Sequence, residues 1–107
     1  MARYMLTNKA VADLTKIWSY TYFKWSESQA DKYYQMLLDN CAQVADNPDL
    51  GKDYFIVSDN LLGFRAGRHI IFYRRIDGDK IEVIRILHEQ MDLENRLSLC
   101  SGEGRII

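Results

Sequence analysis

Cationic side chains are concentrated in one short stretch of the sequence. Its four arginines and one histidine, with no acidic residue among them, are Arg65, Arg68, His69, Arg74 and Arg75. A guanidinium presents a planar fork of donors that binds carboxylates and phosphates in bidentate fashion. The stretch therefore predicts a surface for an acidic partner, although solvated charges that keep a strand edge from pairing would give the same pattern.

Arg85 lies in a segment, residues 81–87, that is otherwise mostly apolar. A guanidinium in such a segment needs a partner because burying an unpaired charge is costly. A half-buried ion pair with Asp13, Glu82 or Asp92 would supply one. Alternatively, Arg85 points into a site at the centre of a sheet.

His69 and His88 are the residues whose side chains could act as general acid or base near neutral pH. Neither has a nucleophile in a recognisable arrangement, and a lone strand histidine is more often a hydrogen-bonded wall residue. Arg85 and His88 are three positions apart, so a single pocket would have to draw on neighbouring strands. Together with Cys41 and Cys100 the histidines show no metal-ligand spacing, so we expect no metal and no cofactor.

Aromatic residues invite a second hypothesis, the stacking of nucleic-acid bases. Most of them follow helical spacing, which predicts core packing instead: Trp18, Tyr20, Tyr22, Trp25, Tyr33 and Tyr34. Only Phe72 or Tyr73 would then remain as a stacking platform on a strand.

Two helices and four strands are expected to position these side chains. Residues 3–6 form a strand candidate, and Thr7 can cap a helix that runs to about Trp25. Its predicted apolar stripe consists of Val11, Leu14, Trp18, Thr21 or Tyr22, and Trp25. Asp13 falls off this stripe, so we expect it on the exposed side.

A second helix begins at a capping box formed by Ser26 and Gln29. It must end near Asp46, because Asn47 precedes Pro48, the only proline. Two amphipathic helices with almost no loop between them predict an antiparallel helical hairpin.

Strand periodicity replaces helical periodicity in the second half of the chain. Residues 47–60 are polar and irregular. Residues 62–66 alternate, residues 69–76 are rich in β-formers, and a turn signal at 77–78 leads into residues 80–88. Three consecutive antiparallel strands are predicted.

The resulting order, β-α-α-β-β-β, predicts an α+β fold with a helical hairpin packed on one face of a mainly antiparallel sheet. Residues 89–97 could add a short final helix. With 107 residues, 48% hydrophobic and 27% charged, we expect one domain over residues 1–97 and a flexible tail over 98–107. Apolar runs are short and no signal segment is recognised, so we expect a cytoplasmic protein.

Several segments resemble ParE toxins of the RelE/ParE superfamily. They are LGFRAGRHIIFYR at residues 62–74, VIRILHEQMD at 83–92, which resembles that branch's R-I-L-H-x-x-M-D ending, and the motifs around residues 25–33. The resemblance covers residues 4–97. It implies the helical hairpin and antiparallel sheet of that superfamily.

The resemblance also separates two activities within the superfamily. The RelE branch cleaves mRNA on the ribosome with Lys and Arg side chains from the sheet and a Tyr near the C-terminus. At the matching positions this chain has His69, Met91 and Leu97, which removes cationic stabilisation of the phosphate. The ParE branch instead inhibits DNA gyrase and is neutralised by ParD antitoxins that wrap around the toxin. The resemblance thus implies a bacterial growth-arrest toxin without catalytic residues.

Site residues follow from the charge pattern and the resemblance together. For a ParD-like antitoxin we expect Arg65, Arg68, Tyr73 and Arg74. For DNA gyrase we expect Arg65, His69, Arg85, His88, Met91 and Asp92. The alternative is a RelE-like endoribonuclease that uses Arg65, His69, Arg85 and His88. A third possibility is a non-toxic member kept only as an antitoxin partner. Neither a membrane nor sequence-specific binding to nucleic acid is expected.

Overall fold

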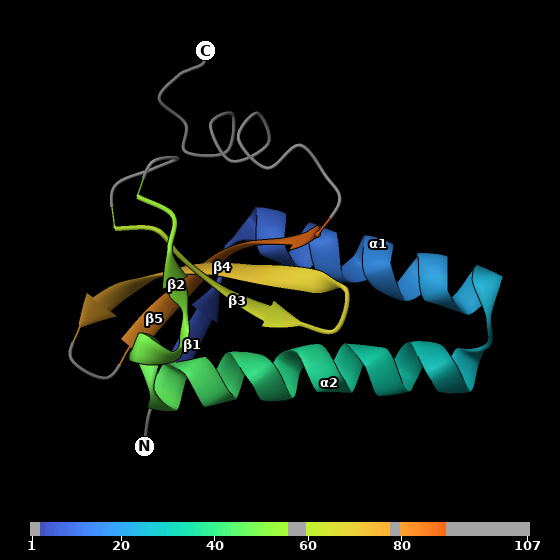
Figure 1. Cartoon of the computed structure of the whole chain (residues 1–107). Helices are drawn as coiled ribbons and strands as arrows, with labels where there is room; N and C mark the ends of the chain where they lie inside the picture. The colour runs from blue at the N-terminus through green and yellow to red at the C-terminus, as the bar shows by residue number, and fades with distance from the viewer. Residues whose placement is uncertain (1–2, 56–59, 78–79, 90–107) are drawn as a thin grey trace, which may run out of the picture.

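Two long helices pack against one face of a five-stranded sheet (Figure 1). The computed structural model describes residues 3–55, 60–77 and 80–89, so the expected helix at 89–97, the tail and the residues Met91 and Asp92 lie outside the described part. The elements in chain order are β1 (Arg3–Leu6), α1 (Asn8–Lys24), α2 (Glu27–Asp46), the 3₁₀ helix η1 (Pro48–Leu50), β2 (Lys52–Asp53), β3 (Leu62–Ala66), β4 (His69–Asp77) and β5 (Lys80–His88).

The strands are arranged in the order β1-β5-β4-β3-β2. β1 is parallel to β5, and every other pair is antiparallel. The α+β class and the three consecutive antiparallel strands are therefore confirmed. The expectation that residues 47–60 are irregular is wrong in part, because η1 and β2 lie there and β2 pairs with β3.

Both helices begin at the predicted caps. The Thr7 hydroxyl accepts from the Ala10 amide at 3.1 Å and donates to the Ile84 carbonyl at 2.7 Å. The Ser26 hydroxyl accepts from the Gln29 amide at 3.1 Å. A side-chain oxygen at this position satisfies an amide that has no partner within the helix. Through the bond from Thr7 to Ile84, the cap also fixes α1 to β5.

A β-bulge changes the alternation of side chains in β5. Tyr73 pairs with Val83, but Phe72 pairs with Arg85, so Ile84 is an extra residue in β5. Val83 and Ile86 consequently lie in the same core cluster although they are three positions apart. After the bulge, the alternation of side chains between the two faces of β5 is shifted by one residue.

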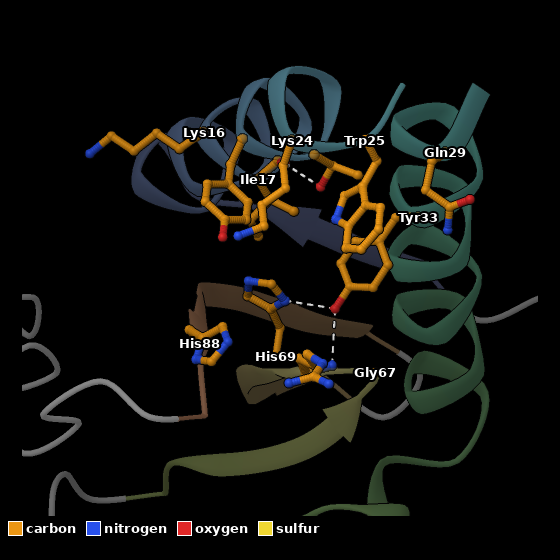
Figure 2. Close-up of a pocket in the computed structure, with 12 residues that line it drawn as sticks. Lys16, Ile17, Lys24, Trp25, Gln29, Tyr33, Gly67, His69 and His88 are labelled. Carbon is orange, nitrogen blue, oxygen red and sulfur yellow. Dashed lines mark hydrogen bonds between the residues drawn. The ribbon is translucent and has the colours of Figure 1, made fainter. Parts of the chain in front are cut away.

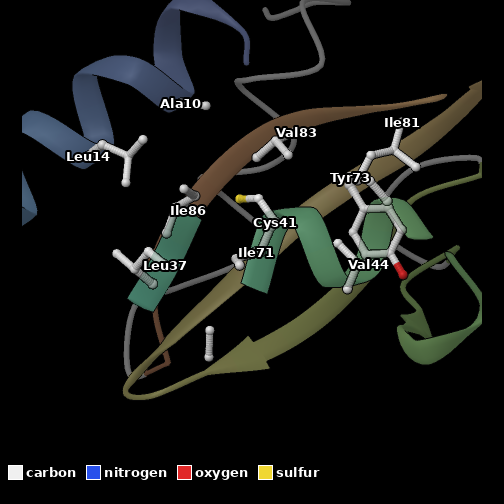
Figure 3. Close-up of a cluster of buried hydrophobic side chains, with 12 residues drawn as sticks. Ala10, Leu14, Leu37, Cys41, Val44, Ile71, Tyr73, Ile81, Val83 and Ile86 are labelled. Atoms are coloured by element: carbon white, nitrogen blue, oxygen red, sulfur yellow. The ribbon is translucent and has the colours of Figure 1, made fainter. Parts of the chain in front are cut away.

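The main core lies between the sheet and the helices (Figure 3). A smaller cluster on the opposite face contains Leu61, Ile70, Phe72 and Leu87. Phe72 and Tyr73 are completely buried, one in each cluster, so neither can serve as the stacking platform expected on a strand.

The aromatic residues of α1 are largely on the surface, against the prediction that they pack in the core. Four of them at the end of α1 are well exposed: Tyr20 at 63%, Tyr22 at 41%, Phe23 at 83% and Trp25 at 69%. The closed end of the helical hairpin projects beyond the sheet, so the sheet does not cover them (Figure 1). The face of α1 that meets the sheet carries Ala10, Asp13, Leu14 and Ile17 instead.

Candidate functional site

A cavity of about 770 Å³ lies between the closed end of the helical hairpin and the neighbouring ends of β4 and β5 (Figure 2). We call it the hairpin cavity. It is lined by Lys16, Ile17, Tyr20, Thr21, Lys24, Trp25, Gln29, Tyr33, Gly67, Arg68, His69 and His88. Three predicted site residues, Arg68, His69 and His88, are thus brought together.

The two histidines face each other across adjacent strands. His69 begins β4, His88 ends β5, and the two are register partners. Their ring centroids are 5.3 Å apart with an edge-to-face angle of 83°. The two histidines that line the cavity therefore come from neighbouring strands, as expected for a single pocket in this sheet.

Tyr33 of α2 connects the helical hairpin to this end of the sheet. Its hydroxyl lies 2.7 Å from Nδ1 of His69 and accepts from the Arg68 amide at 3.0 Å. We infer that the hydroxyl donates to Nδ1, which leaves the imidazole proton on Nε2, since this arrangement gives each group one partner. Sequence reasoning placed Tyr33 in the core and missed this role.

Burial keeps the imidazole of His69 and the hydroxyl of Tyr33 uncharged. Burial, with a smaller contribution from the neighbouring His88, lowers the pKa of His69 to about 4, although Asp13 and Glu89 oppose the shift. Burial also raises the pKa of Tyr33. At neutral pH, His69 is therefore neutral and Tyr33 protonated, so the imidazole is not poised as a general acid near pH 7.

A glycine turn makes the close approach of Tyr33 possible. Gly67 connects β3 to β4 with a positive φ of 62°, which side chains rarely adopt. A Cβ atom there would lie 2.7 Å from the Tyr33 hydroxyl oxygen. The turn thus needs glycine both for its backbone and for space.

Arg85 is held inside the molecule by Asp13. Its Nε and Nη2 donate to the two carboxylate oxygens at 2.7 and 2.9 Å, and the Ile86 amide donates to the same carboxylate at 3.0 Å. The side chains of Arg85 and Asp13 are only 14% and 7% exposed. The ion-pair interpretation is confirmed, whereas the expectation that Asp13 is exposed is wrong. The three- and four-residue spacing from Ala10 through Asp13 to Ile17 could have shown that Asp13 shares the buried face.

The other predicted site residues do not form one surface. Arg65 is exposed and pairs with Glu89 near the β3–β4 turn, where Arg68 also lies. Arg74 and Arg75 lie near the other end of β4, and Arg74 is about 17 Å from His69 along the strand at about 3.4 Å per residue. There Arg75 pairs with Asp49. The continuous cationic stretch of the sequence is thus divided between two ends of the sheet.

Tyr73 does not fit its expected contact with an antitoxin. It is completely buried. Its hydroxyl donates to the Pro48 carbonyl at 2.6 Å and accepts from the Gly51 amide at 3.0 Å. Tyr73 instead fixes η1 against β4, and this expectation is corrected.

The structure describes residues 3–55, 60–77 and 80–89 of the chain. Within these ranges, no group of three or more His, Cys, Asp or Glu side chains is placed to hold a metal ion. None of the described helices combines the length and apolarity needed to cross a membrane.

Comparison with known proteins assigns the chain to a family. The profile described as "ParE toxin of type II toxin-antitoxin system, parDE" matches residues 4–93. The chain belongs to the ParE toxin family. Among curated ParE proteins, Toxin ParE1 of Mycobacterium tuberculosis is 34% identical over 96 residues, covering 90% of this chain and 98% of the relative. Toxin ParE1 of Caulobacter vibrioides is 35% identical, covering 91% and 99%.

A third relative and a solved structure extend the comparison. Toxin ParE of Escherichia coli is 35% identical over 98 residues, covering 92% of this chain and 95% of the relative. The fold matches a chain of the chromosomal ParDE TA system from P. aeruginosa with a TM-score of 0.68 and 19% identity, covering 82% of this chain and 95% of that one. At this identity the match to the solved structure concerns the fold alone.

Proposed function

We propose that this member of the ParE family acts in the cytoplasm as a toxin that inhibits DNA gyrase by binding it, without catalysis of its own, and that a ParD-like antitoxin neutralises it. Membership of the family supports the toxin assignment. The gyrase target and the antitoxin are what the family resemblance implies for this chain.

The state of His69 is the observation that carries the non-catalytic mechanism. RNA cleavage by general acid-base catalysis needs one group that gives up a proton and one that takes it. The His69 imidazole is neutral, and its Nδ1 is engaged by Tyr33. Arg85, which a nuclease would need for the phosphate, is instead bound to Asp13.

One observation favours the endoribonuclease as a second candidate. His69, His88 and the cation of Arg68 line the same cavity, so the residue types needed for phosphodiester cleavage do converge. The two candidates therefore differ in what the cavity does, and a direct assay separates them.

The experiment compares the effects of the purified full chain on gyrase and on ribosome-bound mRNA. We expect inhibition of supercoiling or trapped cleaved DNA, graded losses with His69→Ala and His88→Ala, and intact mRNA. Lys32→Ala, an exposed change on α2 outside the cavity, is the control. Site-specific mRNA cleavage that either histidine variant abolishes, with gyrase unaffected, would establish the nuclease. Induced expression without growth arrest would indicate a non-toxic member.

Antitoxin binding is tested at the two ends of the basic strands. We expect an acidic antitoxin segment, disordered when free, to reach Arg65, Arg68 and Arg74, with charge complementarity raising the association rate. Two double reversals separate the ends: Arg65→Glu with Arg68→Glu, and Arg74→Glu with Arg75→Glu. Loss of affinity and of its salt dependence in the first pair supports the proposal. Unchanged binding in both pairs would refute the basic-strand contact.

A further inference from the structure

The hairpin cavity combines flat aromatic walls with cations that have no acidic partner among the described residues. Tyr20 and Trp25 line it and are 63% and 69% exposed. Lys24 and Arg68 line it and form no ion pair within residues 3–55, 60–77 and 80–89. None of the described residues that line it is an Asp or a Glu. An apolar, positively charged cavity favours an anion that has a flat apolar body.

We propose that the hairpin cavity binds a nucleoside 5′-phosphate, with the base stacked on Trp25 or Tyr20 and the phosphate held between Lys24 and Arg68. This inference does not depend on gyrase as the target. It assigns a small-molecule ligand to a cavity that a purely protein-binding toxin does not require.

The walls suit a nucleobase. Base stacking on exposed aromatic rings is favourable for every base, because each base has a π-face. The volume, about 770 Å³, lies within the range of small-molecule sites. Gln29 lines the cavity, and its carboxamide makes no hydrogen bond to any described residue. That group offers both a donor and an acceptor to the edge of a base.

The cations suit a phosphate dianion better than a single carboxylate. Lys24 comes from the end of α1 and Arg68 from the turn before β4, so they approach from opposite walls. In Figure 2 the side chains of Lys24 and Trp25 point from α1 toward His69 and Tyr33, whereas the Lys16 ammonium points away. Two separate cations can each bind a different phosphate oxygen. A peptide carboxylate, with one charge, would use only part of this arrangement.

Fluorescence of Trp25 in the purified full chain tests the proposal. The other tryptophan, Trp18, is removed by Trp18→Phe so that emission reports on the cavity. The probes are AMP, adenosine, ribose 5-phosphate and inorganic phosphate. We expect saturable quenching by AMP, about tenfold weaker binding of adenosine and of ribose 5-phosphate, and weakening of AMP binding by added salt.

Matched variants locate the ligand, with isothermal titration as a readout that does not need Trp25. Lys24→Ala and Trp25→Ala should each weaken AMP binding about tenfold. The controls Lys32→Ala and Phe23→Ala, exposed residues of the same types outside the cavity, should leave it unchanged. Equal affinity for inorganic phosphate and AMP, no saturable change at millimolar AMP, or equal losses in variants and controls would overturn the proposal. Tighter, competing binding of the blocked peptide Asp-Phe-Glu would reassign the cavity to an acidic peptide.

Discussion

Asp13 connects three parts of the molecule through a single carboxylate. It lies on α1, accepts two hydrogen bonds from Arg85, and accepts from the amide of Ile86 just after the bulge of β5. A bulge leaves local backbone groups without their ladder partners, and a side-chain carboxylate can supply one. The ion pair therefore fixes α1 to β5 at the bulge.

Removing this carboxylate should be costly. We expect Asp13→Ala to lower the free energy of unfolding by about 3 to 5 kcal/mol, because the buried guanidinium loses its counter-charge. Asp49→Ala, which removes the exposed partner of Arg75, should cost less than about 1 kcal/mol. Urea denaturation of both variants measures the difference. Equal, small losses would show that the Asp13–Arg85 pair is not a buried contact.

Acid should destabilise the protein through His69. Its folded pKa, about 4, lies below the ordinary 6.5, so between these values the unfolded state binds more protons and stability falls as pH falls. After allowance for partial solvation of the ring, we expect a loss of about 1 to 2 kcal/mol across this window. His69→Gln should have a flatter stability profile between pH 6.5 and 4. An NMR titration midpoint near 6.5 for His69 itself would contradict the lowered pKa.

Sequence reasoning at the residue scale succeeded where a charge had to be explained and failed where exposure had to be judged. An arginine in an apolar strand correctly predicted an ion pair, with Asp13 among its candidate partners. The same reasoning expected Asp13 on the exposed side, since polarity and burial are normally opposed. Tyr33 was assigned to the core because periodicity cannot show which hydroxyl meets a distant histidine.

At the scale of elements, the local signals were the reliable ones. The caps at Thr7 and Ser26 and the end of α2 before Pro48 depend on a few neighbouring residues, and the structure places all three as predicted. The bulge at Ile84 and the short strand β2 depend on partners far along the chain. Period-2 patterns cannot reveal either of them.

The turn between β3 and β4 offers a test at this scale. We expect Gly67→Ala to lower the free energy of unfolding by about 1 to 3 kcal/mol, because Cβ meets both a positive φ and the Tyr33 hydroxyl. Asn60→Ala changes a residue with a similar φ of 61° at an exposed position. Only the Gly67 variant should also shift the NMR titration of His69. A shift in both variants would show that crowding of Tyr33 is not its cause.

At the scale of the whole molecule, the projecting end of the helical hairpin is the largest departure from expectation. It carries Tyr20, Tyr22, Phe23 and Trp25, which we call the hairpin aromatic patch. The predicted apolar stripe is wrong as the core face of α1: Val11 and Trp25 are 47% and 69% exposed. The sheet meets a different face of the helix, which carries Ala10, Asp13, Leu14 and Ile17. Tyr22 and Phe23 of this patch contact each other edge to face, with ring centroids 5.1 Å apart. Exposed apolar surface of this kind is typical of sites that contact another molecule.

The free chain should therefore self-associate through this patch. Tyr22→Ser with Phe23→Ser should lower the sedimentation coefficient at high protein concentration, because the apolar contact area is lost. Leu50→Ser, at an apolar residue that is 41% exposed on η1, is the matched control. Unchanged sedimentation in the double variant, or the same decrease in the control, would show that the patch is not the contact.

The parallel pairing of β1 with β5 joins the two ends of the described fold. The Thr7 hydroxyl donates to a carbonyl 77 positions later, and Asp13 binds an amide 73 positions later. A chain leaves the ribosome from its N-terminus, so β1 and α1 wait for their partners until β5 has been synthesised. Such distant pairing slows folding. A nascent chain that stalls before residue 80 thus lacks the strand that holds α1 in place, and lacks His88 as well.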